Sequence, residues 1–236
     1  MRKTKVYWAY YTAPPMVQTS LGKYSMLDEK IHHTQLMGIP PERLINNLKS
    51  LPTWRDTLHG DILKCPAAVD HIRNTYVIKS PCDELFVREG DRIRNENVEY
   101  DANTSLQFQN TISYCFFSES PVMMTVTPPY YHKGVLPGSS ACLDISKWFR
   151  PVSANILAED YKTIPIKEGQ PIMYVFFDKA VELKQFSINQ ELVSMSNVTV
   201  NLKHYLPNKS LKELYNMFTR NRMNKRVLKE IKRNLI

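Results

Sequence analysis

Residues 163–188, TIPIKEGQPIMYVFFDKAVELKQFSI, decide the fold class. Three short apolar or alternating stretches, 163–166, 171–177 and 181–188, are separated by the connections 167–170 and 178–180. Short stretches bounded by Gly, Pro and Asp are typical of β-strands, whereas a helix needs a longer run with a period near 3.6 residues. This segment therefore predicts consecutive strands joined by tight connections.

The same pattern extends toward the N-terminus. Further strands are predicted at a spacing of roughly ten residues, over 6–11, 75–79, 84–88, 106–109, 112–118, 122–127, 141–145 and 152–158. Short helices are predicted for 42–51, which follows two prolines, and for 66–74. Many short strands with brief connections favour a sandwich, jelly roll or small barrel over βαβ units.

Glycine is scarce, with 7 residues in 236, and no glycine-rich phosphate-binding motif occurs. This composition disfavours a nucleotide-binding α/β fold. We predict a mainly β protein with a sandwich or jelly-roll-like body, short N-terminal helices and a basic helical C-terminal appendage.

Charge divides the chain into a body, residues 1–208, and a tail, residues 209–236. Nine of the 31 Lys and Arg and two of the 23 Asp and Glu lie in the tail, which gives it a charge of +7. The remaining 22 basic and 21 acidic residues leave the body at +1. A field focused on one segment attracts polyanions or an acidic protein surface.

The tail has helical periodicity in two parts. One apolar stripe consists of Leu211, Leu214, Tyr215 and Phe218, and the other of Met223, Val227, Leu228, Ile231 and Leu235. The second stripe is rotated from the first, which predicts two short helices joined near residues 219–222. On the second helix the cations fall opposite the apolar stripe; they are Lys225, Arg226, Lys229, Lys232 and Arg233. Three interpretations remain open: a solvated face whose apolar side packs on the body, a contact for a protein partner, or a nucleic-acid contact through residues 209–236.

A second candidate for partner binding is Trp148, Phe149 and Arg150 in the segment KWFRP, residues 147–151. Trp and Arg are enriched among the residues that dominate protein interfaces. The segment TPPYYH, residues 127–132, follows an apolar strand, and we expect it to cap one end of the core.

His59, Gly60 and Asp61 form an HxD sequence, which could join His132 in the two-histidine, one-carboxylate iron site of a dioxygenase. The pattern fits poorly, because HxD precedes most of the predicted strands. In addition, Cys142 occupies the place where an arginine is expected after the distal histidine. We therefore predict a surface turn at residues 59–61, with no metal and no cofactor.

The four cysteines, Cys65, Cys82, Cys115 and Cys142, are widely spaced and form no CxxC pair. We expect free thiols in the core. The chain shows neither a signal peptide nor a long apolar run, so we expect no membrane contact.

Five motifs occur in an order that resembles an uncharacterised protein family of large tailed phages, notably marine T4-like ones, with distant bacterial relatives. They are CPAAVD at 65–70, YVIKSP at 76–81, TPPYYH at 127–132, DISKWFRP at 144–151 and KEGQPIMY at 167–174. The resemblance covers residues 60–190. It implies a mostly β phage protein made in the host bacterial cytoplasm, and it implies no catalytic residue or cofactor.

In that setting the sequence favours a non-enzymatic component that binds another phage or host protein, within a virion or an assembly intermediate. The first alternative is an intracellular host-takeover or DNA-associated factor that binds nucleic acid through its basic tail. The second alternative is a metal-dependent dioxygenase that uses His59, Asp61 and His132.

Overall fold

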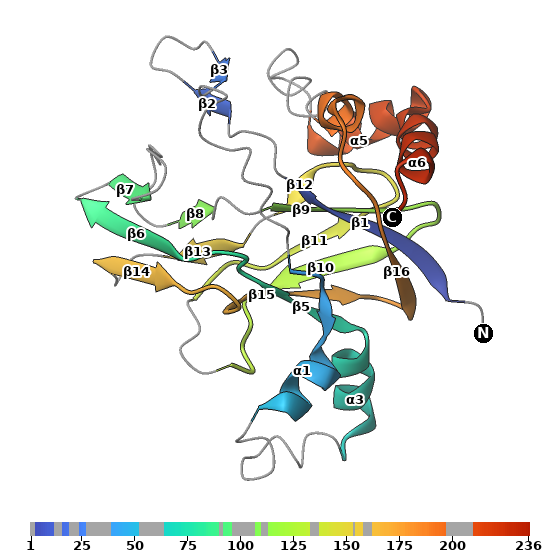
Figure 1. Ribbon diagram of the computed structural model, residues 1–236. Helices are drawn as coiled ribbons and strands as arrows, with labels where there is room; N and C mark the ends of the chain where they lie inside the picture. Colours follow the sequence, from blue (N-terminus) through green and yellow to red (C-terminus); the bar gives the residue numbers. More distant parts are fainter. Residues whose placement is uncertain are drawn as a thin grey trace.

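The computed structural model contains two central β-sheets (Figure 1). It describes residues 3–11, 16–18, 24–26, 39–51, 64–89, 92–95, 107–109, 113–132, 137–152, 154–157, 162–196 and 210–236. The first sheet, which we call the β1 sheet, has the strand order β12 (Pro151–Val152), β9 (Ser113–Ser118), β1 (Thr4–Tyr11) and β16 (Val181–Gln185). The second, the β15 sheet, has the order β11 (Ala141–Asp144), β10 (Met123–Thr127), β15 (Pro171–Phe177), β5 (Thr75–Lys79) and β4 (Glu42–Arg43).

Smaller sheets extend from this centre. One has the strand order β14 (Thr163–Ile166), β6 (Glu84–Glu89) and β7 (Arg92–Asn95). Two antiparallel pairs are formed by β13 (Asn155–Leu157) with β8 (Gln107–Gln109), and by β2 (Met16–Gln18) with β3 (Tyr24–Met26).

The inner faces of the two central sheets share one core. Side chains alternate between the faces of a strand, and on β1 the residues Val6 and Trp8 belong to this inner cluster. The cluster also holds Phe116 from β9 and Phe177 from β15, whose ring centroids are 6.1 Å apart. The two sheets therefore pack face to face.

Each outer face is covered by helices, so the molecule has four layers (Figure 1). Tyr7 and Ala9 on the outer face of the β1 sheet pack with α5 (Leu211–Arg220) and α6 (Met223–Arg233). On the far side, Val77 and Tyr174 of the β15 sheet pack with α1 (Leu44–Ser50) and α3 (Pro66–Arg73).

Local sequence signals explain where α5 and α6 begin. Ser210 and Glu213 form a capping box at the start of α5, each satisfying a backbone N–H group of the other. Between the helices, Arg222 has a left-handed backbone with φ of 55°, which lets the chain turn and begin α6 at once. The prediction of two helices joined near residues 219–222 is confirmed.

The end of the chain is tied to the β1 sheet. Leu235 forms an antiparallel bridge with Phe186, directly after β16. Two backbone hydrogen bonds complete the contact, from Ser187 N to Asn234 O at 2.8 Å and from Ile236 N to Gln185 O at 3.1 Å. The tail is thus part of the core and of a sheet edge, rather than an appendage to a separate body. The apolar sides of both tail helices pack on the β1 sheet, and this packing is compatible with each of the three interpretations of the cations.

The mainly β character predicted from the sequence is confirmed, and α1 and α3 lie within the predicted helices. A jelly-roll arrangement is not confirmed. In a jelly roll neighbouring strands run antiparallel, whereas β1 and β16 pair in parallel, with Val6 opposite Leu183. These two strands come from opposite ends of the chain, so no local pattern could reveal their pairing.

Among the described residues, no helix has the length and apolar content needed to cross a membrane.

All four cysteines are free, but only Cys115 is buried. Cys65 and Cys142 are exposed, so the expectation of core thiols was wrong for these two, which lie at the start of α3 and on the edge strand β11.

We expect the substitution Ile231→Ala to lower the free energy of unfolding by about 2–5 kcal/mol, because it leaves a cavity between α6 and the β1 sheet. Ile231 has no exposed surface. Urea denaturation followed by circular dichroism measures the change. Lys229→Ala, on the exposed side of the same helix, is the matched control and should change stability by less than about 0.5 kcal/mol. Equal effects of the two substitutions would contradict the packing described.

Candidate functional site

One side of α6 is a strongly charged surface. We call it the cationic face, and it consists of Lys225, Arg226, Lys229, Lys232 and Arg233, all exposed. With about 100° and 1.5 Å per residue, these side chains occupy an arc about 120° wide and about 12 Å long. The five predicted cations therefore lie together on one surface.

Packing on the opposite side determines where this face points. Val227 and Ile231 are fully buried in the cluster that joins α6 to the β1 sheet. Because a helix is rigid, burial of its apolar side directs the other side toward solvent. The cationic face is thus held in a defined orientation.

The negative charge of α6 lies beneath the face and not on it. Glu230, the only acidic residue of α6, is 7% exposed and accepts hydrogen bonds from Asn189 at 2.9 Å and Asn234 at 3.1 Å. The Asn189 hydrogen bond is the main reason why the pKa of Glu230 lies below its ordinary value. The carboxylate therefore stays ionised while serving the contact between α6 and residues 189–196.

Only part of the face is neutralised by ion pairs. Arg233 contacts Glu230 at 3.1 Å and Lys232 contacts Glu119 at 3.2 Å. Lys225, Arg226 and Lys229 have no carboxylate partner within the described part of the chain. These three cations are available to an external anion.

Two further cations lie where α5 meets α6. Arg220 ends α5, Arg222 precedes α6, and both side chains are exposed. Both lie outside the second predicted helix, so the five cations opposite its apolar stripe do not include them. The sequence TRNR at 219–222, located at a predicted helix junction, was the signal that could have identified them.

The second predicted partner surface, Trp148 to Arg150, is used inside the molecule. Trp148 is 5% exposed and its ring centroid lies 4.2 Å from that of Tyr215 on α5. Phe149 is fully buried and lies edge-on to Phe117 of β9. Arg150 is half-buried, with its guanidinium 5.3 Å from the Trp148 ring. In this conformation Trp148 and Phe149 anchor α5 and offer no surface to a partner.

A polar network lies on the opposite side of the molecule, centred on His132. Its Nδ1 atom is 2.6 Å from the hydroxyl of Tyr174, and its Nε2 atom is 2.7 Å from Oδ1 of Asn47. Asn47 donates from Nδ2 to Glu42, which also accepts from Lys79 at 2.7 Å. The network thus links the segment before β11 with β4, α1, β5 and β15.

The hydrogen-bond pattern around His132 indicates which ring nitrogen carries the proton. Because Asn47 uses its amide nitrogen to donate to Glu42, its oxygen faces His132 and accepts the Nε2–H proton. Nδ1 of a neutral ring then accepts the Tyr174 hydroxyl proton, and Tyr174 O accepts from Tyr131 N at 3.2 Å. All four of these hydrogen bonds can form together when the His132 ring is neutral.

The pKa values of two other groups in the network are shifted. Burial raises the pKa of Glu42, but the hydrogen bonds from Lys79 and Asn47 outweigh it and hold that pKa below its ordinary value. Burial raises the pKa of Tyr174 well above the ordinary tyrosine value, so its hydroxyl keeps the proton it donates. The network therefore supports the fold as a set of partly buried groups joined by hydrogen bonds.

These contacts also bear on the dioxygenase alternative. Both ring nitrogens of His132 are engaged, so a metal ion would have to displace Tyr174 or Asn47. His59 and Asp61 lie outside the described residues. Within the ranges that the structure describes, no three His, Cys, Asp or Glu side chains are grouped so that they could hold a metal ion.

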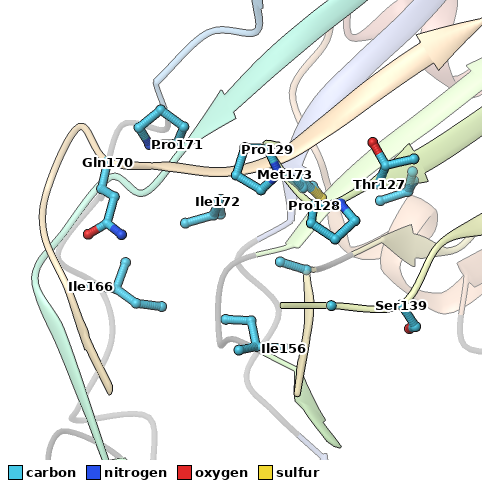
Figure 2. A pocket seen from close by; sticks show the side chains of 13 residues that line it. Thr127, Pro128, Pro129, Ser139, Ile156, Ile166, Gln170, Pro171, Ile172 and Met173 are labelled. Atoms are coloured by element: carbon cyan, nitrogen blue, oxygen red, sulfur yellow. The ribbon is translucent and has the colours of Figure 1, made fainter. Parts of the chain in front are cut away.

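A cleft that is partly open to solvent lies between the start of β15 and the segments at Ser139 and Ile156 (Figure 2). Its lining is mainly apolar, with Ile156, Ile166 and Ile172 directed inward. The residues that line it include no ionisable side chain. The residues that line the cleft therefore offer no acid or base for catalysis.

We expect Tyr174→Phe to lower the free energy of unfolding by about 1–3 kcal/mol, because it removes the hydroxyl group that contacts His132 Nδ1 and the Tyr131 N–H group. Tyr130→Phe is the matched control. The Tyr130 hydroxyl bonds to His71, but its side chain is half-exposed, so water can replace the lost contact. Chemical denaturation of both variants measures the difference, and an equal effect would contradict the buried network.

Comparison of the chain with protein-family models, with curated proteins and with solved structures finds no match. The charges and contacts of the described residues are therefore the basis for assigning a function.

Proposed function

We propose that this chain is a phage protein that acts in the bacterial cytoplasm and binds nucleic acid through the cationic face of α6. The observation that carries the proposal is the group of exposed cations Lys225, Arg226 and Lys229 on an anchored helix, which have no carboxylate partner among the described residues. The phage setting rests on the resemblance of residues 60–190 described above.

Charge supports a polyanionic partner. The tail carries +7 against +1 for the rest of the chain, and on the cationic face two of the five cations have carboxylate partners. Nucleic acids hold a dense layer of condensed counterions, and a protein that replaces those ions gains free energy by releasing them. The three cations that have no carboxylate partner among the described residues are suited to that exchange.

Anchoring of the helix supports binding without a folding step. Val227 and Ile231 hold α6 on the β1 sheet, so the positions of the cations are established before the partner arrives. Ordering a disordered basic tail upon binding would consume part of the interaction free energy. An anchored helix avoids that loss.

The experiment is fluorescence anisotropy with a labelled DNA duplex between about 50 and 200 mM salt. We expect the wild-type affinity to fall steeply with salt. The triple variant Lys225→Gln/Arg226→Gln/Lys229→Gln should lose at least about 10-fold in affinity, with a salt slope smaller by about 3, because each cation that contacts a phosphate contributes about one unit.

The matched control is Lys162→Gln/Lys167→Gln/Lys179→Gln, which removes the same charge from exposed positions at the β14 and β15 turns. It should retain most of the wild-type affinity. Equal losses in both variants would show that net charge alone is responsible, and the absence of salt-dependent binding in the wild type would reject the proposal. Substitution is preferred to deletion of residues 210–236, because deletion exposes the buried rings of Phe117, Phe149 and Phe186.

A protein partner is the second candidate, and one observation favours it. Leu235 and Ile236, at the end of α6, are 46% and 78% exposed, so apolar side chains adjoin the cations as they do in many protein interfaces. This candidate corresponds to a virion or assembly component. Quantitative mass spectrometry of purified, nuclease-treated virions separates the two: a fixed number of copies per particle favours the protein partner, and absence from the particle favours the intracellular nucleic-acid contact.

A further inference from the structure

We infer that the nucleic acid bound by the cationic face is a duplex, held through its phosphate backbone. This inference rests on the proposed function and specifies its ligand. The evidence consists of the aromatic side chains near the face, the rigidity of the helix and the distribution of its charge.

Proteins that bind single strands combine cations with exposed aromatic rings on which unstacked bases lie. In the described part of α5 and α6 the aromatic rings are turned inward. Phe218 is 1% exposed, and Tyr215 is half-buried against Trp148 at a centroid distance of 4.2 Å. Among the residues that the structure describes, the cationic face therefore has cations without a stacking platform.

Tyr130 is an exposed aromatic side chain, but it lies on another surface of the molecule. Tyr130 is 50% exposed, but it contacts His71 of α3 and Tyr174 of β15. Tyr174 belongs to the cluster formed with α1 and α3, on the outer face of the β15 sheet. Both central sheets lie between α3 and α6 (Figure 1). A short single strand of nucleic acid therefore cannot contact Tyr130 and the cationic face at once.

A duplex fits the rigid geometry of the face. The cations occupy about 12 Å along one side of a straight helix, and a duplex presents phosphates at fixed positions on either side of a groove that admits a helix. A single strand must first be ordered along the same side. A preorganised ligand on a preorganised surface avoids that entropic loss.

Charge density favours the duplex as well. Contact with a duplex phosphate releases about 0.9 counterion, compared with about 0.7 for a single strand. If all five cations of the face contact phosphates, the expected slope of log affinity against log salt is about −4.5 for a duplex and about −3.5 for a single strand. The contacts are to phosphate, which DNA and RNA duplexes share.

The test compares one labelled oligonucleotide as a single strand and as a duplex, with an RNA duplex of the same sequence as a third probe. Salt titrations are run on the wild type, on Lys225→Gln/Arg226→Gln/Lys229→Gln and on the charge-matched control. We expect the wild type to bind the DNA duplex at least about 10-fold more tightly than the single strand, and the α6 variant to lose that preference. Equal or tighter binding of the single strand, lost in the same variant, would overturn the duplex inference while leaving the proposed function intact.

Failure of the proposed function has a different signature: no probe would bind in a manner that depends on the α6 cations.

The RNA duplex separates the two sources of the same backbone chemistry. Comparable binding of both duplexes shows that the phosphates alone are recognised. Selective binding of the DNA duplex shows that α6 enters the major groove, which is wide in B-form DNA and narrow in A-form RNA. Displacement of the DNA duplex by poly-glutamate at equal charge concentration would instead identify an acidic polypeptide as the ligand and overturn the inference.

Discussion

The packing of α5 and α6 on the outer face of the β1 sheet is the contact on which the rest of the structure depends. It buries Phe218, Val227 and Ile231 against side chains of β1 and β9. Burial of each such side chain contributes about 1.5–3 kcal/mol, whereas a whole domain is stable by only about 5–15 kcal/mol. Without these two helices, the outer face of the β1 sheet would present aromatic rings to water.

The same contact connects stability with the proposed function. One side of α6 completes the core and the other carries the cations, so the helix cannot rotate to hide its charge without exposing Val227 and Ile231. Glu230 takes part in the inner contact through Asn189 and Asn234. As a result, the side of α6 that faces solvent carries cations, held at fixed positions. Such a surface attracts an anionic partner at a distance and meets it without prior ordering.

The opposite outer layer has a different character. There α1 and α3 cover the β15 sheet, and His132, Tyr174, Asn47 and Glu42 satisfy one another through directional hydrogen bonds. Networks of this kind specify one arrangement of the packed segments, since each unpaired member would be costly. The two outer layers thus differ in role: one supports an exposed charged surface, whereas the other fixes the segments around a buried polar group.

The sequence by itself determined the features that depend on local periodicity and charge. These are the strands of residues 163–188, the two tail helices and the five cations opposite an apolar stripe, because side chains a few residues apart must share or alternate faces in any fold. Tertiary structure alone decided whether Trp148 and Phe149 face a partner or the core, since both outcomes have the same local pattern. It also decided the parallel pairing of β1 with β16 and the partners of His132. Those contacts join segments far apart in the chain, and only the complete fold brings them together.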